Sequence, residues 1–188
     1  MKKHIITIAG RPGSGKSTTA RSVASKLEYE HFSSGDLFRA LAKERGTDVL
    51  GANLNAENNA EIDHLVDARL RDIGDTKSDM VVDSRTAWHW MPASFKVFLD
   101  LDLEIAAHRI INVLAERKDL NEEISKDPKE YAAVLKRRLD SENHRYHNLY
   151  KIDPGKMSNY DLVVDTSNNN LAQVVDLILK SYKQWLQP

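Results

Sequence analysis

The chain has 188 residues, of which 41% are hydrophobic and 29% are charged, so it can form a sizeable apolar core without disulfides or a structural metal. It contains no cysteine, which excludes disulfide scaffolds, zinc–thiolate sites, iron–sulfur clusters and cysteine nucleophiles. The 27 lysines and arginines nearly balance the 28 aspartates and glutamates, and the net charge of −1 excludes a global basic field for wrapping nucleic acid.

Short apolar runs alternate with longer helical segments, and this alternation predicts an α/β fold around a mainly parallel sheet. Most of the short runs are apolar on both faces, as in strands that are covered by helices on each side. The expected strands are His4–Ala9, Glu30–Ser33, Met80–Asp83, Phe95–Leu99 and Tyr160–Asp165. The expected helices are Lys16–Leu27, Gly35–Arg45, Glu57–Ile73, Leu103–Arg117, Pro128–Tyr150 and Leu171–Trp185. We therefore predict one domain over residues 1–188, a three-layer sandwich with a five-stranded parallel sheet.

Two polar segments do not fit a minimal sandwich of sheet and helices. Residues 47–77 are polar and helical without a strand of their own, and residues 117–130 are almost wholly charged. Both are either solvated excursions or flaps over a site.

The N-terminal sequence does not predict a membrane or secretory segment. Two lysines precede an apolar run, but that run is too short for a signal peptide and RPGSGK follows at once. No other stretch approaches the ~18 apolar residues that a membrane-spanning helix needs. We expect a cytoplasmic protein.

A phosphate-binding loop is the strongest motif in the chain. GRPGSGKS at Gly10–Ser17 matches G-x-x-x-x-G-K-[ST] between an expected strand and an expected helix. Gly13 and Gly15 allow backbone conformations in which successive N–H groups converge on one anion, and the helix start adds a positive dipole end. Lys16 reaches the β- and γ-phosphates of a bound nucleotide, and the Ser17 hydroxyl is a ligand for magnesium.

Asp83 ends the short apolar strand MVVD. A carboxylate at this position is what a magnesium site beside a phosphate loop needs, although an aspartate that caps a turn would look the same. Together with the loop, it predicts a metal role for Ser17 and Asp83.

Two short patterns imitate the guanine-nucleotide motifs of GTPases. Asp48–Gly51 spells D-x-x-G and Thr76–Asp79 spells T-K-x-D, in the right chain order. The first follows a helical segment and the second precedes the strand that it should follow, so we assign both to loops.

Arginines in several places favour a kinase that acts on a second, anionic substrate. Arg39 lies one turn into the helix that SSGDLFR opens, and Arg85 follows the strand that ends at Asp83. Arg138 and Arg145 lie on one face of one helix with Glu142 between them. Each alone is typical of a solvated surface residue, but together they suit transfer of a phosphoryl group.

At this point the chain resembles the nucleoside monophosphate kinases, and within them the cytidylate kinases of the short, archaeal-like type. The resemblance covers most of the chain. Its carriers are IITIAGRPGSGKST, HFSSGDLFRALAKERG, VVDSR, KRRLDSENHRY followed by LYKID, and NYDLVVDTS.

The resemblance implies ATP as phosphoryl donor, magnesium as metal, and CMP or dCMP as acceptor. It implies an acceptor-binding insert at residues 34–76 and a lid at residues 117–137. The ATP-binding residues would be Gly10, Pro12, Gly13, Ser14, Gly15, Lys16, Ser17, Thr18, Arg109 and Asn168, with the adenine near Thr166–Asn168. The acceptor-binding residues would be Ser34, Gly35, Asp36, Arg39, Arg85 and Asp140. The residues acting on the transferring group would be Lys16, Arg85, Arg117, Arg138 and Arg145.

Other features leave alternatives open. Trp88–Trp90 is a run of aromatic rings that either stacks on a base or packs in the core. Asp63, His64 and Asp67 either read a base edge or lie on a solvated helix face.

Two other functions compete with this one. The first is the same fold with another acceptor, such as AMP, UMP, dephospho-coenzyme A or shikimate. The second is a regulatory module that binds a nucleotide and uses residues 117–130 to dock a partner. We expect a monomer that binds nucleotide substrates and neither nucleic acid nor membrane.

Overall fold

The computed structural model describes residues 2–46, 61–116 and 127–187. Within these residues five strands form one sheet: β1 (Ile5–Gly10), β2 (Glu30–Ser33), β3 (Met80–Asp83), β4 (Phe95–Asp100) and β5 (Leu162–Asp165). Their order is β2-β3-β1-β4-β5, and every neighbouring pair is parallel. The five-stranded parallel sheet predicted from the sequence is confirmed.

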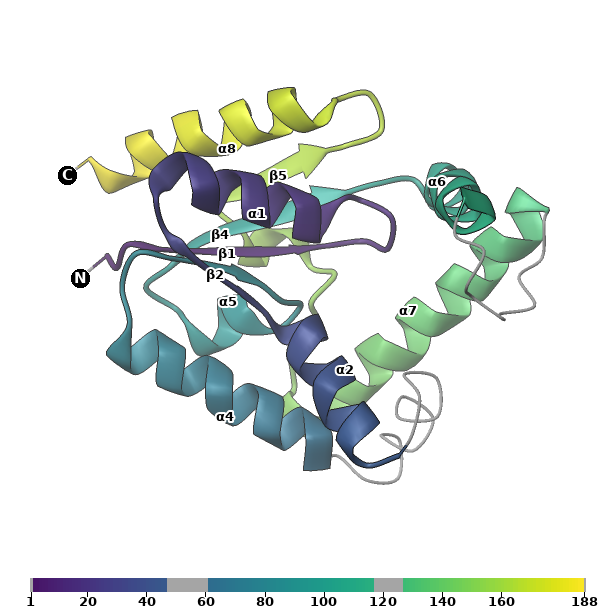
Figure 1. Cartoon of the computed structure of the whole chain (residues 1–188), viewed down its shortest axis with the longest axis horizontal. Coiled ribbons are helices and arrows are strands. Elements are labelled where there is room, and N and C mark those ends of the chain that lie inside the picture. The colour runs from purple at the N-terminus through teal and green to yellow at the C-terminus, as the bar shows by residue number, and fades with distance from the viewer. Residues whose placement is uncertain (1, 47–60, 117–126, 188) are drawn as a thin grey trace.

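Helices cover both faces of this sheet (Figure 1). They are α1 (Lys16–Leu27), α2 (Ser34–Glu44), α4 (Glu61–Thr76), α5 (Ala87–Trp90), α6 (Leu103–Glu116), α7 (Pro128–Tyr150) and α8 (Leu171–Leu186), with a 3₁₀ turn at Met157–Asn159. In Figure 1, α1 and α8 lie on one face and α4 and α5 on the other, with α6 and α7 beyond the sheet edge. The three-layer sandwich is therefore confirmed.

The core forms on both faces because successive side chains of a strand point to opposite sides. Ile6 and Leu99 pack with Ile178 of α8 in the cluster beneath α1 and α8. Ile5 and Val82 belong to a second cluster, beneath α2, α4 and α5. A smaller third cluster joins α6 to α7.

The strand register brings the predicted site residues to one edge of the sheet. Asp83 is paired in register with Ile8 on one side and with Ser33 on the other. The loop after β1, the end of β3 and the start of α2 therefore meet at the carboxyl ends of the strands, where open α/β sheets bind ligands.

The described part of the chain locates several of the segments expected from the sequence. α2 and α4, within the predicted insert, pack against one another through the second cluster. The D-x-x-G pattern at 48–51 lies outside the described residues, as does much of the predicted lid. Of the T-K-x-D pattern, Thr76 ends α4 and residues 77–79 lie in the loop before β3, which is predicted for the whole pattern. None of the described helices is long and apolar enough to cross a membrane.

Candidate active site

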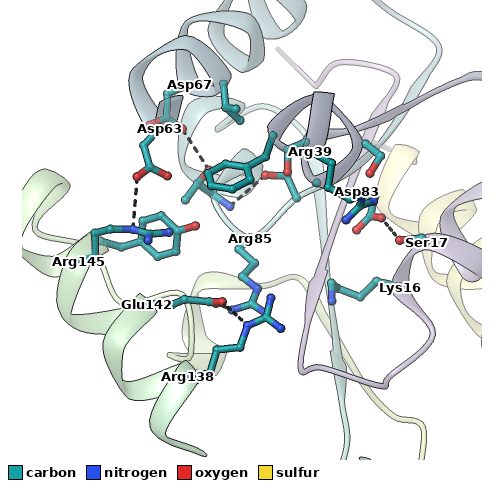
Figure 2. Close-up of a pocket in the computed structure, with 18 residues that line it drawn as sticks. Lys16, Ser17, Arg39, Asp63, Asp67, Asp83, Arg85, Arg138, Glu142 and Arg145 are labelled. Carbon is teal, nitrogen blue, oxygen red and sulfur yellow. Dashed lines mark hydrogen bonds and ion pairs between the residues drawn. The ribbon is translucent and has the colours of Figure 1, made fainter. Parts of the chain in front are cut away.

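A cavity of about 220 Å³ opens at this edge of the sheet (Figure 2). α1, α2, α4, α7 and the segment after β3 all contribute to its walls. Its charged lining residues are the basic Lys16, Arg39, Arg85, Arg138 and Arg145 and the acidic Asp63, Asp67, Asp83 and Glu142. Five basic and four acidic side chains thus share one small space, and their arrangement determines which ligand suits it.

The phosphate loop connects β1 to α1 at one end of the cavity. Gly13 and Gly15 have φ values of 72° and 81°, so both take the left-handed conformation expected of them. The hydroxyl of Ser14 is buried and has no hydrogen-bond partner in the described chain. α1 begins at Lys16, which directs the positive end of the helix dipole at the loop.

The Lys16 ammonium group lies 3.5 Å from the carbonyl oxygen of Arg11 and lines the cavity. Burial, and after it the charge of Arg85, lower the pKa of Lys16 to about 8, while the charge of Asp83 opposes the shift. An anion that binds beside Lys16 favours the charged form of the lysine and so raises its pKa again.

Ser17 and Asp83 face one another where α1 and β3 meet. Asp83 is buried at 5% exposure, and its carboxylate accepts a hydrogen bond from the Ser17 hydroxyl. One carboxylate and one hydroxyl beside a phosphate loop match the sparse oxygen ligands that Mg²⁺ takes from such proteins, with phosphates and water supplying the rest. These residues therefore fit the metal.

Glu142 of α7 holds two arginines of the site together. Its carboxylate forms an ion pair with Arg85, and it lies 3.0 Å from the Nε of Arg138. Burial and, after it, the charges of Arg138 and Arg145 lower the pKa of Arg85 to about 10. Glu142 thus supplies the negative charge that keeps closely spaced arginines in place.

A second connection runs from α7 to α4, three residues further along. The Nε of Arg145 lies 3.3 Å from Oδ2 of Asp63, and both side chains are buried. Burial raises the pKa of Asp63, and the nearby charge of Asp67 adds to the shift while Arg145 opposes it. Figure 2 shows Asp63 and Asp67 at the far end of the cavity from Lys16 and Ser17.

The structure brings most of the sequence-predicted site residues together. Those that line the cavity are Lys16, Ser17, Ser34, Gly35, Arg39, Asp83, Arg85, Arg138 and Arg145.

The other predicted residues lie elsewhere. Asp36 is exposed and forms an ion pair with Arg39. Asp140 is exposed, lies 2.9 Å from the ammonium group of Lys136, and lines a separate cavity behind the phosphate loop. Arg109 donates a hydrogen bond of 2.7 Å to the carbonyl of Thr166, so α6 lies beside the loop that contains Asn168. Arg117 is outside the described residues.

The structure decides between the alternatives that the sequence left open on α4 and α5. Asp63 and Asp67 are 6% and 4% exposed, so they do not lie on a solvated face, whereas His64 does. Trp88 and Trp90 are half-buried and pack against Tyr160 and Tyr150 respectively, and neither lines the cavity.

Glu142, Phe38 and Tyr146 also line the cavity, and sequence reasoning gave none of them a role in the site. Glu142 was noted only as lying between two arginines. Its spacing from Arg138 and Arg145 on α7 is the signal that could have identified it, because all three share one face of the helix.

Comparisons with known proteins agree with this geometry. A family model described as an AAA domain matches residues 9–144. A cytidylate kinase of Halobacterium salinarum is 39% identical over 178 residues, which cover 93% of this chain and 87% of that protein. A cytidylate kinase of Methanocorpusculum labreanum is 36% identical over 180 residues, which cover 94% of this chain and 96% of that protein.

Solved structures share the fold at low sequence identity. The shikimate kinase of Bacteroides thetaiotaomicron aligns with a TM-score of 0.62 at 14% identity, over 97% of this chain and 98% of that one. A gluconokinase of Sinorhizobium meliloti aligns with a TM-score of 0.60 at 16% identity, over 98% of this chain and 95% of that one. At such identities the match concerns the fold alone.

Proposed function

This chain belongs to the cytidylate kinase family, and from that membership we propose that it transfers the γ-phosphoryl group of ATP to CMP or dCMP, giving ADP and the corresponding diphosphate. The observation that carries the proposal is one cavity that joins a phosphate loop to an arginine cluster. Two anionic substrates need such a cavity, since their phosphates must approach one another against electrostatic repulsion.

The ATP triphosphate occupies the phosphate loop in this proposal. The loop's backbone N–H groups, among them those of Gly13 and Gly15, and the positive end of α1 hold it, with Thr18 in the first turn of α1. The Lys16 ammonium group lies beside the β- and γ-phosphates. Arg109 and Asn168, near the loop after β5, hold the adenine.

Ser17 and Asp83 hold Mg²⁺ in the proposed complex. When bound, the metal would supply positive charge that offsets the negative charge of the phosphates. The hydrogen bond between Ser17 and Asp83 keeps both oxygen ligands at the phosphate loop beforehand.

The acceptor phosphate lies against Arg39 of α2 and Arg85 after β3. Ser34 and Gly35 at the start of α2 lie beside it, and Asp36 orients Arg39. An oxygen of this phosphate attacks the γ-phosphorus in line, and the bond from that phosphorus to the β-phosphate oxygen breaks. No side chain acts as nucleophile, because the acceptor phosphate is one already. Arg138 and Arg145 add positive charge around the transferring group, and their effect comes from positioning and electrostatics.

The proposal treats residues 1–188 as one kinase domain that acts as a monomer. Within it, residues 34–76 are proposed as the acceptor-binding insert and residues 117–137 as the lid; residues 47–60 and 117–126, Arg117 among them, lie outside the described residues.

An assay of ADP release tests the proposed function. Mg·ATP is offered with CMP, dCMP, UMP, AMP, GMP, dephospho-coenzyme A or no acceptor. We expect CMP or dCMP to give the highest kcat/KM. Higher kcat/KM with another acceptor would overturn the assigned substrate, and ATP binding without transfer to any acceptor would favour a regulatory module.

A further inference from the structure

The two ends of the cavity differ in chemistry. The end at the phosphate loop carries Lys16, Ser17 and Asp83, whereas the end at α4 carries Asp63 and Asp67 (Figure 2). The phosphates of both substrates belong at the basic end. The α4 end is therefore where the rest of the acceptor must lie.

Asp67 is held at that end by two hydrogen bonds to one of its oxygens. Its Oδ1 accepts a hydrogen bond of 2.9 Å from Nε1 of Trp90 and one of 3.3 Å from the hydroxyl of Thr86. The aromatic ring of Trp90 lies beneath the guanidinium group of Arg71, 3.9 Å from its centroid. These contacts fix the orientation of the carboxylate.

The other oxygen of Asp67, Oδ2, is buried and has no hydrogen-bond partner in the described chain. Buried polar atoms are nearly always hydrogen-bonded, so a partner missing from the protein indicates one that arrives with a ligand. Asp63, one turn away, already faces Arg145. Asp67 therefore offers the cavity a fixed acceptor oxygen.

Apolar groups line the same cavity. Phe38 of α2, Val66 of α4 and Tyr146 of α7 all contribute to its wall. Two aromatic rings and an aliphatic side chain suit the faces of a planar heterocycle, and base–aromatic stacking is favourable for any base. Stacking therefore holds a base without selecting it, and selection needs a hydrogen bond at its edge.

We propose that Asp67 selects the base of the acceptor by accepting a hydrogen bond from the 4-amino group of cytosine. A carboxylate matches this group, whereas uracil places a carbonyl oxygen there and leaves two acceptors facing one another without a proton. This inference rests on the proposed function and assigns its choice between cytosine and uracil to one side chain. Trp90 and Thr86 act as positioning residues, because they orient Asp67 without touching the base.

The hydroxyl of Tyr150 offers another explanation for the burial of the Asp67 carboxylate, namely a structural role. This buried hydroxyl lies beside the carboxylate, and the pKa of Tyr150 is raised by burial first, then by hydrogen bonding to Asp67, and then by the charge of Asp67. If a small rearrangement let Tyr150 donate to Oδ2, Asp67 would stabilise the fold and would not select a base. The experiment must separate these two roles.

The test combines D67N with an acceptor that lacks the amino group, the pyrimidin-2-one ribonucleoside monophosphate. In the wild type we expect kcat/KM for this analogue to be about 10- to 100-fold below that for CMP. In D67N we expect kcat/KM for CMP to fall to about the wild-type value for the analogue. The ratio of kcat/KM for CMP to kcat/KM for UMP should fall about 100-fold. The asparagine carbonyl still accepts from Trp90, so the fold is preserved.

D72N is the matched control, because Asp72 lies on the exposed side of α4 and forms an ion pair with Arg69. Its selectivity should equal that of the wild type. Y150F should likewise leave the CMP to UMP ratio unchanged if Oδ2 faces the base.

If kcat/KM for the analogue were below that for CMP by the same factor in D67N as in the wild type, Asp67 would not contact the amino group, and the proposal would be overturned. A lower Tm in both D67N and Y150F, with an unchanged CMP to UMP ratio, would assign Asp67 to the fold and overturn it equally. A wild type that does not phosphorylate CMP would instead refute the proposed function.

Discussion

Replacement of Glu142 by glutamine tests how the arginine cluster is held before substrates arrive. Glu142 is 8% exposed and is the acidic partner of both Arg85 and Arg138. Glutamine keeps the shape and one acceptor but removes the charge, so the half-buried Arg85 loses its ion-pair partner on α7. The pair with the more exposed Arg138 is screened by solvent and adds little.

We expect E142Q to lower the free energy of unfolding by about 2 kcal/mol, which is the usual scale for weakening a buried charged hydrogen bond. For a chain of this size the Tm should fall by about 4–8 °C. Phosphate ions should stabilise E142Q more than the wild type, because an anion replaces the missing charge.

Thermal unfolding with and without saturating phosphate measures both effects. D140N is the control, since Asp140 lies on the same helix in an exposed pair with Lys136, and its loss should cost less than about 0.5 kcal/mol. An unchanged Tm in E142Q, or an equal fall in D140N, would refute the argument that Glu142 neutralises a buried cluster.

Three further predictions concern the phosphate loop and its neighbours. The pKa of Lys16 is lowered to about 8, so between about pH 8 and pH 10.5 the free folded protein has lost a proton that the unfolded chain retains. The value of kcat/KM for ATP should therefore fall as the pH rises through 8, and K16R should show no such fall. G13A should unfold at a lower denaturant concentration than G46A. Both glycines have positive φ (72° and 68°), but only at Gly13 would the new Cβ approach the Ala106 backbone, at 3.2 Å, which adds about 1 kcal/mol to the backbone cost that both variants share. Equal unfolding midpoints for the two variants would contradict this contact. D83N should raise the Mg²⁺ concentration for half-maximal activity about 10- to 100-fold, and an unchanged Mg²⁺ titration would remove Asp83 from the metal site.

Local sequence signals predicted the sheet and the phosphate loop well because their physical causes are local. Four of the predicted spans coincide with observed elements: Lys16–Leu27 with α1, Glu30–Ser33 with β2, Met80–Asp83 with β3 and Pro128–Tyr150 with α7. A glycine-rich turn between an apolar run and a helix has few other structural interpretations, and Asp83 follows from the end of a buried strand. Parallel pairing then places both at one edge of the sheet.

The sequence offers Asp63 and Asp67 as candidates but cannot decide between a base contact and a solvated face, because their burial depends on contacts between distant segments. Asp63 and Asp67 are buried where α4 meets α7 and α5, and nothing in the sequence around residue 63 indicates that Arg145 lies opposite. α5 was missed for a similar reason, since four residues are too few for a helical period to be visible.

The two ion pairs of α7 limit how this fold can acquire a new substrate. α7 has 23 residues, so it is about 34 Å long, and it contacts the sheet edge through Glu142 and the insert through Arg145. A redesigned α4 without a carboxylate at position 63 would leave Arg145 buried without its counter-ion. An engineer who changes α4 to alter the acceptor must therefore keep this carboxylate or change Arg145 of α7 with it.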